Sequence, residues 1–419
     1  MVTESRLVAF RLLMLVHEGA YANIKLPQLL QKSNMSKQDR GFAQELGYGT
    51  LRMQIQYDAL IKEVTDISKL EPAVLNILRM GLHELLNMRT ENHAAVDQAV
   101  ELCKQEAPKA SGLVNACMRK LSSNALQLLE KLTSGENKVI EFAHPKWIID
   151  ALSASREMDS AGDVETLLAE NNKSPKPQMV ALPPNQVPEG AQPLELSKIG
   201  FESIDDLDLA HFRYQDQGSQ LVTQIAASAS KDGNWLDMCA GPGGKASLLA
   251  AIANQRNTRL TAIELYPKRA DLVKEGLNKF PNAEVFAADA LKFDYDKDYQ
   301  LVLIDAPCTG LGALRRKPES RHNKKPDQIQ NLNQIQKDLL EKAANITAHE
   351  GIIAYVTCSP LIEETTSIAR WFIDNHPEFK ILPWSDYAEL DANKARSTLQ
   401  LWSDRDNADC MFLALFQKQ

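Results

Sequence analysis

The chain has 419 residues, of which 44% are hydrophobic, so it is too long for one ordinary core and we expect two or three domains. No apolar run approaches the length of a membrane span, so the sequence pattern does not predict a membrane-spanning helix. The net charge of −8 gives no general support for nucleic-acid binding.

The cysteines and the first residues indicate a reducing compartment. The six cysteines are scattered without a C-x-x-C pair, which argues against a structural zinc site and against a disulfide framework. Arg6 and Arg11 interrupt the apolar pattern at the N-terminus, which predicts an amphipathic helix and not a signal peptide. We therefore expect a cytoplasmic protein that binds no metal, and we expect it to be a monomer.

The first part of the chain has the pattern of a helical bundle. Apolar residues such as Leu7 and Phe10 recur at helical spacing over residues 1–130, and glycine and proline are scarce there. Proline then becomes frequent, and extended P-x-P runs appear. We expect an all-helical domain over 1–130 and a linker or small α+β RNA-recognition subdomain over 131–205.

Residues 206–419 alternate between short apolar strands and helices. The segment W-L-D-M-C-A is followed by S-L-L-A-A-I-A, then by R-L-T-A-I-E-L and A-D-L-V-K-E-G-L. This alternation is typical of βαβ units around a parallel sheet. We therefore expect an α/β domain with a mostly parallel sheet.

A glycine-rich loop, G-P-G-G-K-A at residues 241–246, follows the first of these strands. Glycines let the backbone approach a ligand closely, and the start of a helix favours an anionic group. A P-loop would need glycine at Cys239 and a hydroxyl side chain at Ala246, and the dinucleotide fingerprint would need glycine at Ala246. The loop therefore does not support a pyrophosphate cradle.

Two acids follow at the ends of the next strands. Glu264 ends L-T-A-I-E, the place of a carboxylate that holds a ribose diol, and Asp289 follows the next strand and could meet an adenine edge. A nucleoside without a pyrophosphate fits the loop and both acids. The expected cofactor is S-adenosylmethionine.

Two cysteines each follow a buried strand. Cys308 lies in L-V-L-I-D-A-P-C-T-G and Cys358 in G-I-I-A-Y-V-T-C-S-P. Ligands of an open α/β sheet bind outside the carboxyl ends of its strands, so we expect both thiols, with Asp305, at the active site. The alternative for either cysteine alone is that of a small buried hydrophobic residue.

These motifs resemble a known family. The segments D-M-C-A-G-P-G-G-K-A, V-L-I-D-A-P-C-T-G-L-G, Y-V-T-C-S-P-L-I-E-E and F-R-Y-Q-D-Q-G-S-Q-L-V resemble the RNA 5-methylcytosine methyltransferases of the Nol1/Nop2/Sun family. The segments R-G-F-A-Q-E-L-G-Y-G-T-L-R and N-H-A-A-V-D-Q-A-V-E resemble the NusB-type RNA-binding domain. The resemblance implies a NusB-like helical bundle followed by a Rossmann-like domain with a seven-stranded sheet. It also implies formation of 5-methylcytosine in 16S ribosomal RNA.

The resemblance also implies roles for single residues. Cys358 is the expected nucleophile on C6 of the base, Cys308 assists product release, and Asp305 protonates or hydrogen-bonds the base near N3. The target base must leave its RNA stack to reach them. The implied cofactor-binding residues are Cys239, Ala240, Gly241, Pro242, Gly243, Gly244, Lys245, Glu264, Asp289 and Asp305. Lys245 also fits a residue on the helix surface, and the sequence leaves both interpretations open.

A basic segment follows Cys308. Residues 315–325 hold six Lys or Arg against one Glu, and we expect Arg315, Arg316, Lys317 and Arg321 to contact RNA phosphates, although a solvated loop is the alternative. The sequence departs from the family after R-R-K-P, and again at Cys410, for which core packing is the expected role.

Two other functions remain open. One is methylation of transfer RNA or another RNA by the same catalytic domain. Another is a NusB-like assembly factor with an inactive transferase domain. A DNA cytosine methyltransferase would need only the P-C thiol and would leave Cys358 unexplained.

Overall fold

The computed structural model describes residues 2–135, 137–204, 207–208, 211–296, 298–388 and 396–419. The chain folds into two compact units that are interleaved in sequence. The helical unit comprises Met1–Ser153, Asp163–Ser174 and Leu314–Lys324, and the catalytic unit comprises Ala154–Gly162, Pro175–Ala313 and Lys325–Gln419.

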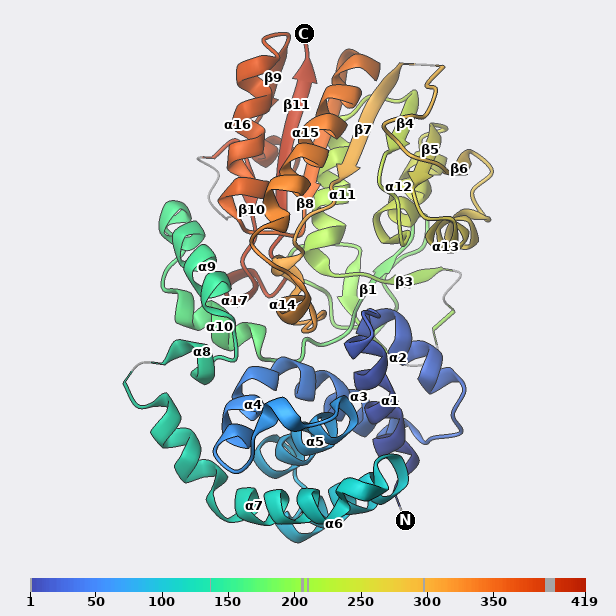
Figure 1. Ribbon diagram of the computed structural model, residues 1–419. Coiled ribbons are helices and arrows are strands. Elements are labelled where there is room, and N and C mark those ends of the chain that lie inside the picture. Colours follow the sequence, from blue (N-terminus) through green and yellow to red (C-terminus); the bar gives the residue numbers. More distant parts are fainter. Residues whose placement is uncertain (1, 136, 205–206, 209–210, 297, 389–395) are drawn as a thin grey trace. The chain divides into compact units, whose positions relative to one another are not determined.

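The helical unit is built from helices alone among its described residues (Figure 1). Its helices are α1 (Glu4–His17), α2 (Ala22–Gln31), α3 (Lys37–Arg52), α4 (Gln54–Lys62), α5 (Pro72–Asn87), α6 (Asn92–Glu106), α7 (Ser111–Thr133), α8 (Lys138–Glu141), α10 (Val164–Asn171) and α14 (Ser320–Asn323), with the first part of α9 (Lys146–Asp159). This confirms the helical front expected from the spacing of apolar residues.

The bundle core and its polar contacts explain why these segments are helical. Leu12, Leu46 and Leu60 lie fully buried on the inward stripes of α1, α3 and α4. Ser36 caps α3 by accepting a hydrogen bond from the Asp39 amide at 3.1 Å. Each helix therefore buries one apolar face, and the first turn of α3 has its amide satisfied locally.

The segment Leu314–Lys324 belongs to the helical unit, although it lies in the middle of the catalytic sequence. Arg321 is 1% exposed and donates to the carbonyls of Arg52 at 2.9 Å and Ala143 at 3.1 Å. Glu319 accepts a hydrogen bond from the Ala22 amide, at the start of α2, at 3.0 Å. The basic segment is thus built into the bundle as a structural element.

The catalytic unit contains two sheets. Its strands are β1 (Gln178–Ala181), β2 (Gly200–Glu202), β3 (Phe212–Tyr214), β4 (Asn234–Asp237), β5 (Arg259–Glu264), β6 (Ala283–Ala287), β7 (Tyr299–Asp305), β8 (Thr347–Thr357), β9 (Phe379–Leu382), β10 (Leu399–Gln400) and β11 (Phe412–Lys418). Its helices are α11 (Gln217–Ala229), α12 (Gly244–Gln255), α13 (Pro267–Leu277), α15 (Gln328–Ile346), α16 (Thr366–Asn375) and α17 (Ser403–Asp406).

The large sheet has the order β10-β11-β8-β7-β4-β5-β6, and β9 also pairs with β11. The pairs among β4 to β8 are parallel and those of β11 are antiparallel, which confirms the mostly parallel sheet. Among the described residues the large sheet has eight strands, where seven were expected, because β10 pairs with the start of β11 and β9 with its end. A separate antiparallel sheet has the order β2-β1-β3.

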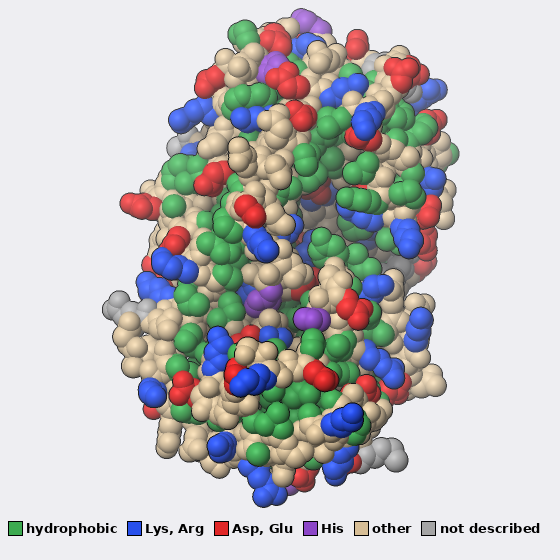
Figure 2. Space-filling model, in the orientation of Figure 1, with side chains coloured by type: hydrophobic (Ala, Val, Ile, Leu, Met, Phe, Trp, Pro, Cys, Tyr) green, Lys and Arg blue, Asp and Glu red, His purple; other side chains and the backbone are tan. Residues whose placement is uncertain are grey.

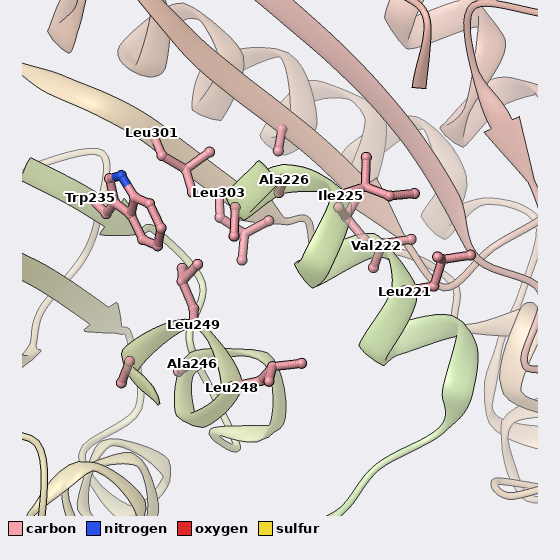
Figure 3. Close-up of a cluster of buried hydrophobic side chains, with 14 of the residues drawn as sticks. Leu221, Val222, Ile225, Ala226, Trp235, Ala246, Leu248, Leu249, Leu301 and Leu303 are labelled. Carbon is pink, nitrogen blue, oxygen red and sulfur yellow. The ribbon is translucent and has the colours of Figure 1, made fainter. Parts of the chain in front are cut away.

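Each face of the large sheet carries its own core, because side chains alternate along a strand. Leu301 and Leu303 of β7 pack with α11, α12 and Trp235 of β4 (Figure 3). Val302 and Ile304 point to the other face, which α15 and α16 cover. The near-continuous apolar strands of the sequence are therefore strands buried on both faces.

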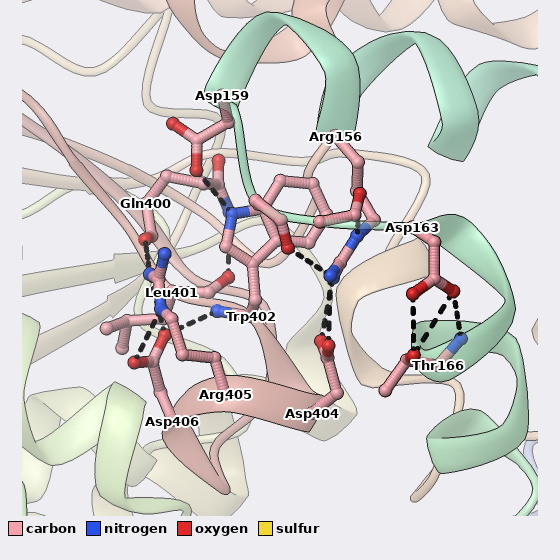
Figure 4. Close-up of polar contacts among 12 residues, drawn as sticks. Arg156, Asp159, Asp163, Thr166, Gln400, Leu401, Trp402, Asp404, Arg405 and Asp406 are labelled. Atoms are coloured by element: carbon pink, nitrogen blue, oxygen red, sulfur yellow. Dashed lines mark hydrogen bonds and ion pairs between the residues drawn. The ribbon is translucent and has the colours of Figure 1, made fainter.

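The last turns of α9 belong to the catalytic unit because they pair with its C-terminal segment (Figure 4). Arg156 forms an ion pair with Asp404 at 2.7 Å and lies over the Trp402 ring, 5.0 Å from its centroid. The indole of Trp402 donates to Asp159 at 2.6 Å. The segment 131–205, expected as a linker or a small α+β subdomain, contributes residues to both units, and the sequence-based domain boundaries stay a prediction.

Charged side chains of both signs are interspersed over the face shown in Figure 2. No helix among the described residues is long and apolar enough to span a membrane.

Candidate active site

The site lies at the carboxyl edge of the large sheet. Asp237 ends β4, Glu264 ends β5 and Asp305 ends β7, and the strand register places these ends side by side. Cys358 follows Thr357, the last residue of β8. Parallel strands deliver all of these side chains to one edge, as the sequence pattern predicts.

The glycine loop joins β4 to α12. Gly243 has a φ of +104°, which favours glycine, and it caps the N-terminus of α12. A side chain at Gly241 would collide with the Glu264 carboxylate, whereas the space beside Gly244 is open. The loop therefore needs glycine at 241 and 243 for its own geometry, and it leaves the backbone at 244 open to a ligand.

Glu264 is 3% exposed and stabilises this loop through hydrogen bonds. Its carboxylate accepts hydrogen bonds from the Gly241 amide at 3.0 Å and the Tyr266 amide at 2.9 Å, and Arg269 lies 3.2 Å away. Oε2 faces both the Gly241 amide and Arg269, whereas Oε1, among the described residues, meets only the Tyr266 amide and keeps a second lone pair for a ligand hydroxyl. The role expected for Glu264 in cofactor binding is compatible with this geometry and stays a prediction.

Asp289 lies two residues beyond β6 and is more open. One of its oxygens accepts a hydrogen bond from the Leu291 amide at 3.0 Å, and the other lies 3.5 Å from the Lys292 ammonium. Its side chain is 34% exposed. It can therefore meet a ligand from the solvent side, as its predicted role requires.

Lys245 is not a residue of the helix surface. Its ammonium lies 2.9 Å from the Asp305 carboxylate, and its side chain is 11% exposed. Burial lowers the pKa of Lys245, but the charge of Asp305 and its hydrogen bond outweigh burial and raise the pKa overall. The structure thus decides between the two interpretations that the sequence left open: Lys245 points into the site.

Asp237 is a site residue that the sequence analysis missed. It is fully buried, and its Oδ1 accepts a hydrogen bond from the Cys239 amide at 3.3 Å, while its Oδ2 has no partner among the described residues. Burial, and then the charge of Asp305, raises the pKa of Asp237 to about 7. An acid at the end of a strand in L-D-M-C-A was the available signal.

Cys308 and Cys358 meet in space. Their sulfur atoms are 3.5 Å apart, because β7 and β8 are adjacent and parallel and each cysteine follows its strand closely. The hydrogen bond with Cys358 and burial raise the pKa of Cys308 well above its ordinary value. Cys308 therefore keeps its proton at neutral pH. The catalytic roles of both thiols stay predictions.

Two arginines of the basic segment are buried. Arg315 is 2% exposed and pairs with Glu170 at 3.0 Å, and Arg321 donates to backbone carbonyls of its own unit. This burial does not favour the RNA contact expected for Arg315 and Arg321, and that contact stays a prediction. Arg316 and Lys317 are partly exposed, and their contact with RNA stays a prediction.

Cys410 is 1% exposed and precedes β11 by two residues. Its amide donates to the Gly312 carbonyl at 2.9 Å, and its burial agrees with the core role expected from the sequence. Among the described residues no group of three or more His, Cys, Asp or Glu side chains is placed to hold a metal ion.

Comparison with known proteins identifies the family. Residues 224–417 match the model of 16S rRNA methyltransferase RsmB/F, and residues 3–123 match the NusB family. The chain is 34% identical to "Putative methyltransferase Rv1407" of Mycobacterium tuberculosis, over 99% of this chain and 96% of that protein. It is 30% identical to ribosomal RNA small subunit methyltransferase B of Pseudomonas putida, over 94% of each.

A solved structure agrees on the fold. The crystal structure of PH0851 superimposes with a TM-score of 0.81 at 20% sequence identity, covering 100% of this chain and 99% of that one. With both domains matched in order and a relative at 34% identity over nearly the whole length, the chain belongs to the RsmB/F family of RNA methyltransferases, with a NusB-family domain in front of its catalytic domain.

Proposed function

We propose that the chain forms 5-methylcytosine in 16S ribosomal RNA, with S-adenosylmethionine as the methyl donor and a covalent bond between Cys358 and C6 of the base. The observation that carries this proposal is the 3.5 Å approach of Cys308 and Cys358 beside the Lys245–Asp305 ion pair. The name of the relative from Pseudomonas putida, a ribosomal RNA small subunit methyltransferase, supports the ribosomal substrate. Such a substrate implies a cytoplasmic protein.

The cofactor loop fits a nucleoside ligand. The open backbone at Gly244 and the two acids at consecutive strand ends, Glu264 and Asp289, suit a ligand that has hydroxyl and amino donors and no pyrophosphate. The loop Cys239–Lys245 would hold it, with Glu264 at the ribose and Asp289 at the adenine. When bound, S-adenosylmethionine supplies an electrophilic methyl group.

Cys358 is the nucleophile in this proposal. When its sulfur bonds to C6 of cytosine, electron density moves to C5, which can then take the methyl group. As the adduct forms, N3 takes a proton that Asp305 relays from the Lys245 ammonium, 2.9 Å away. A water molecule then takes the C5 proton, the C5–H electron pair forms the C5–C6 double bond, and the electron pair of the C6–sulfur bond leaves with Cys358 as its thiolate.

Cys308 is assigned to product release. Because its raised pKa keeps it protonated, it is a poor competitor for the base and a hydrogen-bond donor to the neighbouring sulfur. A donor at that position assists a departing thiolate.

Two alternatives have different expected products. A transfer-RNA enzyme would use the same catalytic residues, and the NusB-family front favours ribosomal RNA over it. An inactive assembly factor would not need the ion pair and the paired thiols, which argue against it.

Bisulfite sequencing of 16S and transfer RNA from a deletion strain tests the substrate. We expect one or more 16S cytosines to lose protection in the deletion strain and to regain it when the wild-type gene is restored. Unchanged 16S cytosines together with a lost transfer-RNA signal would replace the ribosomal substrate with the alternative one.

A further inference from the structure

A buried carboxylate behind the two thiols has no part in the mechanism above. Glu364, in the short helix Ile362–Glu364, is fully buried. Its carboxylate accepts hydrogen bonds from the Thr309 amide at 2.8 Å and from the Thr309 hydroxyl at 2.5 Å. Thr309 directly follows Cys308, so Glu364 fixes the backbone next to one of the thiols through these hydrogen bonds.

The residue before Cys308 is held as well. Gln336, in α15, is fully buried and donates from its side chain to the Pro307 carbonyl at 2.9 Å, and the same amide lies 3.5 Å from Glu364. Glu364 is itself anchored, because the Tyr355 hydroxyl donates to its backbone carbonyl at 2.8 Å. Both peptide neighbours of Cys308 are thus fixed to buried side chains of other elements.

The charge of Glu364 needs an explanation beyond packing. Among the described residues no cation pairs with it, and its partners are neutral donors. A buried carboxylate loses its hydration, which costs several kcal/mol before its hydrogen bonds compensate, whereas a neutral side chain of the same size would avoid most of that cost. The nearby reactive group on which such a charge acts is the Cys308 thiol.

We propose that Glu364 is a positioning residue, which holds the Pro307–Thr309 turn so that the Cys308 sulfur faces Cys358. The release role of Cys308 rests on the proposed function, whereas the placement of its sulfur does not. The charged and titratable groups that face Cys308 are Cys358, Glu364, Asp305 and Tyr355, with Lys245 paired to Asp305. Three causes raise the pKa of Cys308 most: the hydrogen bond with Cys358, burial, and the charge of Cys358. The charge of Glu364 comes next.

Disulfide trapping measures the sulfur placement without RNA or cofactor. Diamide takes two electrons and two protons from a pair of neighbouring thiols as their S–S bond forms, and mass spectrometry of the digested full chain quantifies the peptide that joins Cys308 to Cys358. Glu364→Gln should slow this cross-link roughly 10- to 100-fold, the scale of a misplacement of about 1 Å at a reacting pair. Glu363→Gln, the same change at the exposed neighbouring residue, should cross-link like the wild type.

The thiol form is read from alkylation. The pH at which iodoacetamide modifies Cys308 half-maximally should fall in Glu364→Gln, because a negative charge has been removed, and should not change in Glu363→Gln. A purely structural role would leave this pH profile in place. Wild-type cross-linking and an unshifted profile in a folded Glu364→Gln protein would overturn the proposal.

A second variant covers the case in which Glu364→Gln fails to fold. Thr309→Val removes one hydrogen bond to Glu364 and keeps the side-chain size, so it should slow the cross-link by a smaller factor. If Glu364→Gln unfolds and Thr309→Val cross-links like the wild type, Glu364 is structural only and the proposal is wrong.

The two proposals fail separately. Unmethylated 16S cytosines in the wild type would reject the proposed function. Loss of cross-linking in Glu364→Gln would still support the positioning role in that case. If both hold, a single-turnover reaction of Glu364→Gln should form methylated adduct and release it roughly 10- to 100-fold more slowly than the wild type.

Discussion

The helical unit and the catalytic edge both bury charged side chains, but they do so in opposite ways. Arg321 donates to carbonyls of Arg52, Ala143 and Asn171, and burial lowers its pKa to about 9, where it still keeps its proton at neutral pH. At the catalytic edge, one oxygen of Asp237 meets no hydrogen-bond donor within the part of the chain that the structure describes, and the pKa of Asp237 is raised to about 7.

The difference distinguishes buried charged groups that stabilise the fold from buried groups that are suited to chemistry. A buried guanidinium that donates to several backbone carbonyls has one stable protonation state near neutral pH, and its removal costs folding energy. A group crowded by like charges has two states of similar energy near neutral pH, which suits proton transfer and nucleophilic chemistry. Mutations in the two regions should therefore fail in different measurements.

Cys358→Ala should have the largest effect, and it should be confined to catalysis. Without the nucleophile, methyl transfer to a 16S transcript should fall by at least about 10⁴-fold, with unchanged stability, because the side chain is partly exposed and small. Transfer of labelled methyl groups measures the rate, and Cys410→Ala serves as the control thiol. Residual activity near the wild-type level would reject Cys358 as the nucleophile.

Cys308→Ala should stop the reaction at a later point. The first methyl transfer should proceed, and a covalent complex of protein and RNA should accumulate because its breakdown is slowed. A band that resists denaturation on a gel, and disappears after RNase digestion, reports the complex. Rapid turnover with no such band would remove the release role from Cys308.

Arg321→Ala should damage the helical unit and not the chemistry. The change leaves several buried carbonyls without donors, which should lower the free energy of unfolding by about 3 kcal/mol or more in urea titrations. Lys317→Ala, at a partly exposed position of the same segment, should change stability by less than about 0.5 kcal/mol and should reduce the salt dependence of RNA binding. The reverse pattern would restore Arg321 as an RNA contact.

Asp237→Asn should change stability, and the size of the change depends on pH. The pKa of Asp237 is about 7 in the folded state against an ordinary value of 3.8, so folding favours its protonated form. The stability that this acid contributes is present at low pH and is lost as pH rises through 7. The asparagine variant should therefore gain stability relative to wild type, on the order of a few kcal/mol at pH 8 and less at pH 5.

Thermal unfolding at the two pH values measures this difference, and Asp232→Asn, at an exposed surface ion pair, provides the control. An equal effect at pH 5 and pH 8 would mean that Asp237 has an ordinary pKa in the folded protein.

Local patterns in the sequence determined much of this protein. Apolar runs that break at Asp305 and at Thr357 predicted parallel strands, and parallel strands bring their carboxyl ends to one edge, so the meeting of Cys308 with Cys358 followed from pattern alone. The positions of the glycine loop and of Glu264 were also predictable from local pattern, because nearby residues set the backbone conformation and the strand ends.

Only the tertiary structure decided which partner each long or buried side chain meets. Arg321 was expected to contact RNA because its basic segment follows Cys308, yet the segment packs into the helical unit, where Arg321 meets Arg52, more than 250 residues away in sequence. Lys245 pairs with Asp305, and Glu364 accepts a hydrogen bond from the Thr309 amide, although the partners are distant in the chain. Such pairings depend on long-range packing and on the cost of burying charge, which no local pattern of residues records.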